Sequence, residues 1–185
     1  MATSPPPKRT RTSRDDGRRN MVRAAMELLE DRSPDEITVR DIAERAGHHH
    51  RYVQDWFGGK VGLFLEVLTL TSAQLAEYVE LRTPSDQLNP DLARGARLLA
   101  WLATNDPDRL SGDRMRPVVS RMEHFFHDRF GVPRDEARLL ARHTALLMTA
   151  YVVFGHAYGA PDDDHKRLFE LQIRLGQMLG TRPGV

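Results

Sequence analysis

Residues 37–65 read ITVRDIAERAGHHHRYVQDWFGGKVGLFL, and this stretch decides the fold of the chain. Its apolar residues recur at helical spacing on both sides of Gly47 and again after Gly58-Gly59. The pattern predicts two short helices around a tight turn, followed by the start of a longer helix. Helices this short are marginal in water on their own. We therefore expect the longer apolar helices elsewhere in the chain to support them.

Two local signals set the bounds of the first short helix. Thr38 and Asp41 have the spacing of a capping box. In that motif the threonine hydroxyl accepts from the backbone N–H of residue 41, and the carboxylate accepts from the N–H of residue 38. Gly47 follows the last apolar position and suits the left-handed backbone conformation of a helix C-cap.

The spacing around Gly47 matches a helix-turn-helix motif. Such a motif needs a small residue four positions before the turn glycine, where the helices cross, and Ala43 occupies that position. It also needs apolar residues that hold the two helices together, and Ile42, Val53 and Trp56 supply them. The first helix of the motif braces the second, which lies in the major groove and reads base edges. The sequence therefore predicts a DNA-binding protein.

The rest of the chain is also predicted to be helical. No stretch shows a convincing alternating pattern of the kind that strands have. We therefore predict an all-α fold of about nine helices, with an N-terminal three-helix helix-turn-helix domain and a C-terminal helical domain. Besides the two short helices, the candidate segments are 17–31, 60–81, 91–104, 117–130, 134–158 and a final helix that begins at Asp163 or Asp164.

Composition divides the chain into a basic arm at 1–16, a helix-turn-helix domain at 17–62 and a helical domain at 63–185. The arm is rich in Pro, Ser, Thr and Arg, and we expect it to be flexible because it has too little apolar surface to order itself. The first 23 residues hold seven basic and two acidic side chains, giving +5, whereas the whole chain carries +1. The arm either neutralises DNA phosphates or is a solvated tail. Its candidate minor-groove contacts are Lys8, Arg9, Arg11 and Arg14.

The composition also excludes several classes of protein. Hydrophobic residues make up 40% and charged residues 29%, as in soluble globular proteins. The longest apolar run, at 145–154, is too short to cross a bilayer. The absence of cysteine excludes disulfides and thiolate metal ligands. With no apolar leader at the N-terminus, we expect a cytoplasmic, nucleoid-associated protein.

Residues 18–65 resemble the DNA-binding domain of the tetracycline-repressor (TetR) family. The resemblance implies a homodimer that represses a nearby promoter and binds a small ligand in its C-terminal domain. It also implies that the last two long helices of each subunit pair in the dimer. The matching features are Ala24-Ala25, Leu28-Leu29, Thr38 to Ala43, Ala46-Gly47, Trp56-Phe57 and Lys60 with Leu63.

Three positions depart from the family pattern. His48 stands where an aliphatic residue is common, Tyr52 where a small residue is common, and Gln54 where a tyrosine that touches the DNA backbone is common. The resemblance therefore does not assign that backbone contact to Gln54. Tyr52 is the candidate substitute for the missing tyrosine.

The candidate DNA contacts fall into two groups. Arginine can read guanine and glutamine can read adenine, so the second helix of the motif carries the candidate base or backbone contacts. Phosphate contacts are expected from the residues that flank it. The first group is His50, Arg51, Tyr52, Gln54 and Asp55, and the second is Thr38, Arg40, Trp56 and Lys60. Arg18 and His49 are further candidate DNA contacts.

The segment 134–158 is apolar on nearly all sides, which indicates a core on one side and a second subunit on the other. A small hydrophobic ligand is expected among the helices from 91 to 158, although Met and aromatic residues at helical spacing usually form ordinary core. The predicted dimer residues are Leu140, Thr144, Leu147, Leu168, Leu171 and Leu175. The candidate pocket residues are Trp101, Met115, Met122, Phe125, Met148 and Tyr151.

Two other readings are weaker. His48, His49 and His50 point in different directions and lack a partner at a ligating spacing, so we expect no metal and no cofactor. The chain has no phosphate-binding glycine loop, nucleophile elbow or HExxH motif, so we do not expect an enzyme. A regulator or architectural DNA-binding protein without an inducer stays open. It would bind a palindromic site with an affinity that small molecules do not change.

Overall fold

The computed structural model describes residues 13–81, 88–110 and 112–180 of the chain. These residues form helices and connecting segments without any strand, so the all-α prediction is confirmed. The described part has eight α-helices and three short 3-10 turns rather than about nine helices. The α-helices are α1 (Arg14–Asp31), α2 (Val39–Ala46), α3 (Arg51–Phe57), α4 (Lys60–Leu81), α5 (Pro90–Asn105), α6 (Arg116–Phe130), α7 (Arg134–Phe154) and α8 (Asp164–Gly180). The 3-10 turns are η1 (Pro107–Arg109), η2 (Gly112–Arg114) and η3 (Gly155–Tyr158).

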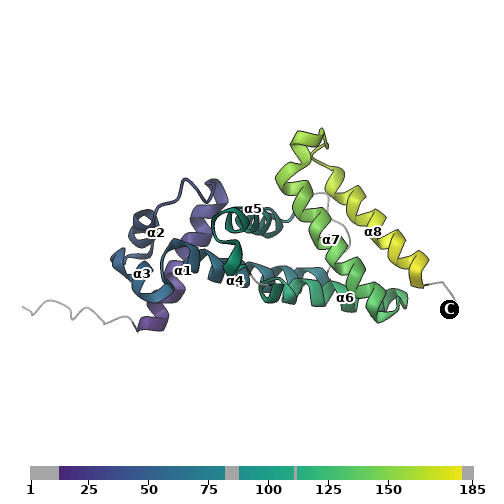
Figure 1. Cartoon of the computed structure of the whole chain (residues 1–185), viewed down its shortest axis with the longest axis horizontal. Coiled ribbons are helices and arrows are strands. Elements are labelled where there is room, and N and C mark those ends of the chain that lie inside the picture. The colour runs from purple at the N-terminus through teal and green to yellow at the C-terminus, as the bar shows by residue number, and fades with distance from the viewer. Residues whose placement is uncertain (1–12, 82–87, 111, 181–185) are drawn as a thin grey trace, which may run out of the picture.

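Helix α4 connects the two ends of the molecule. Helices α1, α2 and α3 gather around its first half, whereas α5 and α6 pack along it (Figure 1). Helices α7 and α8 form a hairpin at the opposite end, and α7 packs on α5 and α6 (Figure 1). Helices α1 and α3 thus pack on one long helix, and α2 packs on α1 and α3.

Two hydrophobic cores lie along α4. The first holds the N-terminal helices on residues 63–68 of α4, and its largest members with no more than 1% exposure include Phe64, Met21, Ile37 and Ile42. The second lies around Phe126 of α6 and takes in Leu75, from the second half of α4. Met115 packs against both cores. Burial of this kind contributes about 25 cal/mol per Å² of apolar surface, which the short helices cannot obtain from one another.

The boundary of the basic arm differs from the prediction. Helix α1 begins at Arg14, because the Ser13 side chain accepts a hydrogen bond from the Asp16 N–H at 3.1 Å and so caps the helix. Arg14 therefore belongs to a helix and not to an arm that ends at residue 16. Lys8, Arg9 and Arg11 lie outside the described residues.

In the described ranges, we find no helix with both the length and the apolar character needed to span a membrane.

Replacing Gly47 tests the backbone conformation of the turn. Gly47 has φ +70°, and no atom lies within 4 Å of a Cβ placed there. Gly47→Ala should therefore lower the free energy of unfolding by ~1–2 kcal/mol, from left-handed backbone strain alone. Gly47→Asn should cost less, although asparagine is larger, because asparagine tolerates this conformation. Urea denaturation measures both variants, and a larger loss for asparagine than for alanine would contradict the backbone explanation.

Candidate nucleic-acid interface

The capping box at the start of α2 is present as predicted. The Thr38 hydroxyl accepts from the Asp41 N–H at 3.2 Å, and the Asp41 carboxylate accepts from the Thr38 N–H at 2.8 Å. Arg32 pairs with the same carboxylate at 3.1 Å. The Thr38 N–H, the Thr38 side chain and Arg32 together hold the pKa of Asp41 below its ordinary value, against a smaller opposing effect of burial.

The turn of the motif also follows the prediction. Gly47 adopts the left-handed conformation, and the His48 N–H donates to the Ala43 carbonyl at 2.9 Å. Ile42, Ala43 and Val53 are at most 1% exposed, so the predicted brace between α2 and α3 is formed. The helix-turn-helix therefore presents one face of α3 to solvent while the other face is packed against α2 and α4.

Polar side chains cover the exposed face of α3 and the turn before it. His49 and His50 stack with ring centroids 4.3 Å apart, and the His49 Nδ1 accepts from the Arg51 N–H at 3.2 Å. The Arg51 guanidinium lies over the Tyr52 ring at 5.0 Å, and its Nη2 is 3.3 Å from the Tyr52 hydroxyl. The predicted contacts that are exposed here are Thr38, Arg40, His49, His50, Arg51, Gln54 and Asp55.

The unusual residues His48 and Tyr52 belong to one aromatic cluster. The rings of Tyr52 and Trp56 stack at 4.5 Å with an interplanar angle of 12°, and the His48 ring meets both edgewise. A Cβ at Gly17 of α1 would lie 2.5 Å from the Trp56 ring, so a glycine is needed there for the close approach. All three cluster rings are half-buried. From the sequence, His48 and Tyr52 were considered separately. Gly17 is the sequence feature that could have indicated their packing with Trp56, because it leaves room for the Trp56 ring.

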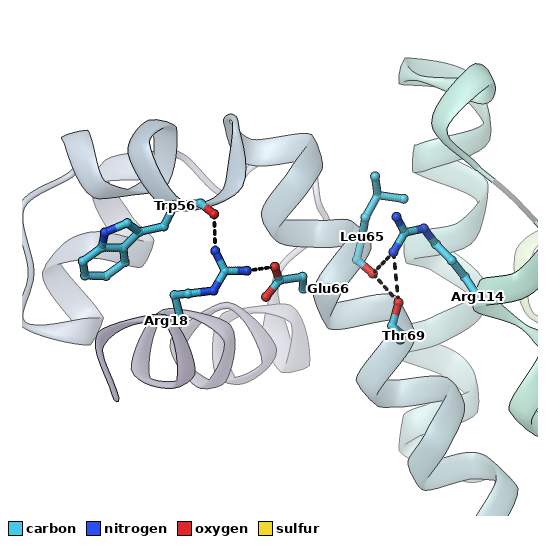
Figure 2. Close-up of polar contacts among 6 residues, drawn as sticks. All are labelled: Arg18, Trp56, Leu65, Glu66, Thr69 and Arg114. Carbon is cyan, nitrogen blue, oxygen red and sulfur yellow. Dashed lines mark hydrogen bonds and ion pairs between the residues drawn. The ribbon is translucent and has the colours of Figure 1, made fainter. Parts of the chain in front are cut away.

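Arg18 was predicted to contact DNA, but its side chain is directed into the protein. The guanidinium donates to the Trp56 carbonyl at the end of α3 and forms an ion pair with Glu66 of α4, as Figure 2 shows. It also lies 4.5 Å from the centroid of the Phe57 ring. Both of its terminal nitrogens therefore donate within the protein, and we withdraw Arg18 from the DNA contacts.

Lys60 and Trp101 likewise differ from the prediction. The Lys60 ammonium lies 5.0 Å from the Trp101 ring and 5.4 Å from the Phe64 ring, and burial lowers its pKa. The Trp101 indole N–H donates to the Asp35 carboxylate at 2.6 Å. Lys60 thus faces α5 rather than the exposed side of α3. Trp101 joins α5 to the segment before α2.

The other predicted pocket residues are packed side chains. Met122 and Met148 are 8% and 6% exposed, and Phe125 meets the rings of two other phenylalanines, Phe126 and Phe130, edgewise. The Tyr151 hydroxyl donates to the Pro161 carbonyl at 2.7 Å, and burial raises the pKa of Tyr151. A groove of about 700 Å³ lies elsewhere, between α1 and α4, and none of the six predicted residues lines it. The ligand pocket therefore stays a prediction.

The predicted dimer face of α7 needs a correction. Leu140 and Thr144 are 4% and 0% exposed, and the Thr144 hydroxyl donates to the Leu140 carbonyl at 2.8 Å, so both residues face the inside of the protomer. Leu139 and Leu146 are 69% and 70% exposed instead. On α8, Leu171 is exposed as predicted for an interface residue. The remaining predicted residues, Leu147, Leu168 and Leu175, are half-buried.

Comparison with known families identifies the N-terminal domain. Residues 21–67 match the profile of the family described as bacterial regulatory proteins, tetR family. A stretch of 102 residues is 31% identical to the HTH-type transcriptional repressor Rv3405c of Mycobacterium tuberculosis, and equally to the HTH-type transcriptional regulator Mb3439c of Mycobacterium bovis. Each match covers 54% of this chain and 54% of the relative, so the chain spans about half the length of the curated relatives it matches.

Solved structures share the fold over most of the chain. A tetR-family transcriptional regulator from Streptomyces coelicolor superposes with a TM-score of 0.57 over 89% of this chain and 83% of its own. The TetR family repressor AlkX from Dietzia sp., implicated in biodegradation of n-alkanes, gives 0.54 over 90% and 97%. Both are 20% identical to this chain, a level at which the likeness establishes the fold alone.

The lowered pKa of Asp41 predicts how its contribution to stability changes with pH. A carboxyl whose pKa is lower in the folded state stabilises the protein above its unfolded pKa of about 3.9, and this contribution is lost as the pH falls through the folded pKa. Asp41→Asn should therefore be less stable than the natural protein at pH 7, and the difference should close below about pH 4. Urea denaturation at several pH values measures the difference. A gap that stays constant from pH 7 to pH 3 would show that the charge of Asp41 does not stabilise α2.

Proposed function

We propose that this chain is a transcriptional regulator of the TetR family and that it acts as a dimer on an inverted repeat in double-stranded DNA. One observation carries this proposal: α3 is braced by α2 and α4 while Arg51 and Gln54 stand exposed on its outer face. A major groove admits a helix of this kind. Arginine there donates to guanine and glutamine pairs with adenine, so these two side chains are the proposed base readers.

The dimer is supported by the outer face of the α7–α8 hairpin. Leu139 and Leu146 lie seven residues apart on α7, and Leu171 and Met178 lie seven apart on α8. All four are more than half exposed. Complete burial of one such side chain contributes about 1.5–3 kcal/mol, so a second copy of this face is a favourable partner. Two protomers joined there would direct two α3 helices to half-sites about one helical turn apart.

We further propose that the protein is a cytoplasmic repressor. A small hydrophobic ligand relieves the repression. Rv3405c and AlkX are both named repressors. Repression follows here if this protein occupies a promoter. A ligand bound among the C-terminal helices would favour a conformer in which the recognition helices have the wrong spacing for DNA. It would weaken DNA binding only to the extent that it binds this conformer more tightly than the DNA-binding one. Met115 packs on both hydrophobic cores, so a ligand that changes the packing of either core also changes the surroundings of Met115.

A regulator without an inducer is the second candidate. The observation that favours it is the tight packing of Met122, Met148 and Phe125 within the protomer. The two candidates differ in one measurable property. Small hydrophobic molecules change the affinity for the selected DNA site under the first proposal and leave it unchanged under the second.

Arg51→Ala tests the proposed base contact. The DNA is the duplex that the natural protein enriches from a random library. Losing one bidentate contact should weaken binding to it by ~1–3 kcal/mol and relax the preference at one base position in each half-site. Fluorescence anisotropy measures the affinity, and a second selection with the variant measures the preference. Arg97→Ala, an exposed change on α5, is the control. Equal preferences for Arg51→Ala and the natural protein would remove Arg51 from the base readers.

Leu146→Arg tests the proposed dimer. A charged side chain at the centre of the α7–α8 face would be buried against an apolar partner, so the variant should be monomeric in light-scattering chromatography. Leu70→Arg is the matched control, because Leu70 is a 41% exposed leucine on α4, away from that face. Its assembly should not change. A Leu146→Arg variant that is still dimeric would assign the interface to another surface.

A further inference from the structure

We propose that Arg18 is a positioning residue that fastens the end of the recognition helix α3 to α4, and that DNA affinity depends on this fastening. The inference rests on the proposed function, since it concerns how the reading helix is held for DNA. It differs from the expectation that an arginine at the start of a DNA-binding domain contacts phosphate. Nothing in the motif itself assigns such a role to a residue of α1.

The contacts of Arg18 converge on the last turn of α3. Its guanidinium donates to the carbonyl of Trp56 (Figure 2). It also lies over the ring of Phe57, which follows Trp56 as the last residue of that helix. The final four carbonyls of a helix have no partner within the helix and form the negative end of its dipole. Arg18 thus supplies both a donor and a positive charge where α3 requires them.

The same guanidinium fixes that end to α4 through Glu66. The ion pair is partly shielded from water, with 27% of the Arg18 side chain and 39% of the Glu66 side chain exposed. Helix α3 has only seven residues and no side-chain hydrogen bond from its N-cap residue His50. Its orientation therefore depends on contacts with its neighbours, and Arg18 joins three elements, α1, α3 and α4, at one point.

A second arginine holds the neighbouring residues of α4 from the C-terminal half of the chain. Arg114 of η2 donates to the Leu65 carbonyl at 3.3 Å and to the Thr69 hydroxyl at 3.1 Å (Figure 2). Residues 65–69 of α4 are thus contacted by Arg18 on one side and by Arg114 on the other. A displacement of η2 that moved this segment of α4 would also move Glu66, and with it the end of α3.

Removing the charge of Glu66 distinguishes a positioning role of Arg18 from a contact between Arg18 and a DNA phosphate. If Arg18 positions α3, Glu66→Gln removes the ion pair that joins Arg18 to α4 and therefore weakens DNA binding. If Arg18 instead contacts phosphate, Glu66 competes with DNA for the guanidinium, so Glu66→Gln strengthens binding. The two roles therefore predict opposite signs for one substitution.

The test measures the affinity of the full chain for the duplex that the natural protein selects from a random library, over a range of salt concentrations. We expect Arg18→Gln to weaken binding about tenfold or more, since a hydrogen-bonded charge is lost. Glu66→Gln should weaken it severalfold, and neither variant should change the salt dependence. Glu77→Gln, an exposed carboxylate on the same helix, is the control and should bind as the natural protein does. Tighter binding by Glu66→Gln, or a salt slope lowered by about one unit in Arg18→Gln, would overturn the proposal.

Hydrogen exchange tests the fastening without DNA, so a failure of the proposed function is distinguishable from a failure of this inference. Amides of residues 51–59 should exchange faster in Arg18→Gln and in Glu66→Gln than in the natural protein, while those of α6 keep their rates. If the natural protein selects no DNA but these rates rise, the proposed function fails and the fastening stands. Unchanged rates at residues 51–59 in both variants would contradict the fastening itself.

Discussion

The packing of α4 against both halves of the molecule is the constraint on which the remaining structure depends. Helices α2 and α3 have eight and seven residues, lengths at which a helix in water is marginal. Helix α4 gives them a hydrophobic surface through its buried residues Leu63, Phe64, Leu65, Val67 and Leu68. Arg18 adds a polar link at the end of α3. Because α4 also reaches the second core through Leu75, α3 and the C-terminal helices pack on the same long helix.

The proposed DNA-reading surface has an ordinary helix-turn-helix scaffold, but unusual residues pack behind it. His48, Tyr52 and Trp56 form an aromatic cluster on α1, and Gly17 leaves room for it. The departures from the family pattern at positions 48 and 52 therefore have a packing explanation. They leave Arg51 and Gln54 as the exposed side chains best suited to bases, with Arg51 already oriented by the Tyr52 ring.

Local rules predicted the features that depend on local geometry. The capping box at Thr38, the left-handed Gly47 and the buried Ala43 each follow from residues within a few positions. Periodicity could not choose the inward face of α7, because a helix that is apolar nearly all round has no single stripe. Packing against neighbouring helices decided it, so Leu140 turned inward and Leu139 outward. Arg18 was misassigned because its partners lie on α3 and α4, which only the tertiary fold brings near. The same holds for Lys60 and the Trp101 ring of α5.

Selection from a library of random duplexes, followed by sequencing, is the measurement that tests the central claim most directly. A dimer that presents two copies of α3 should enrich an inverted repeat whose half-site centres lie about 10 base pairs, or a multiple of one helical turn, apart. The half-sites should contain guanine or adenine at the positions that Arg51 and Gln54 reach. Enrichment of a single asymmetric half-site, or no enrichment above the starting library, would contradict the account.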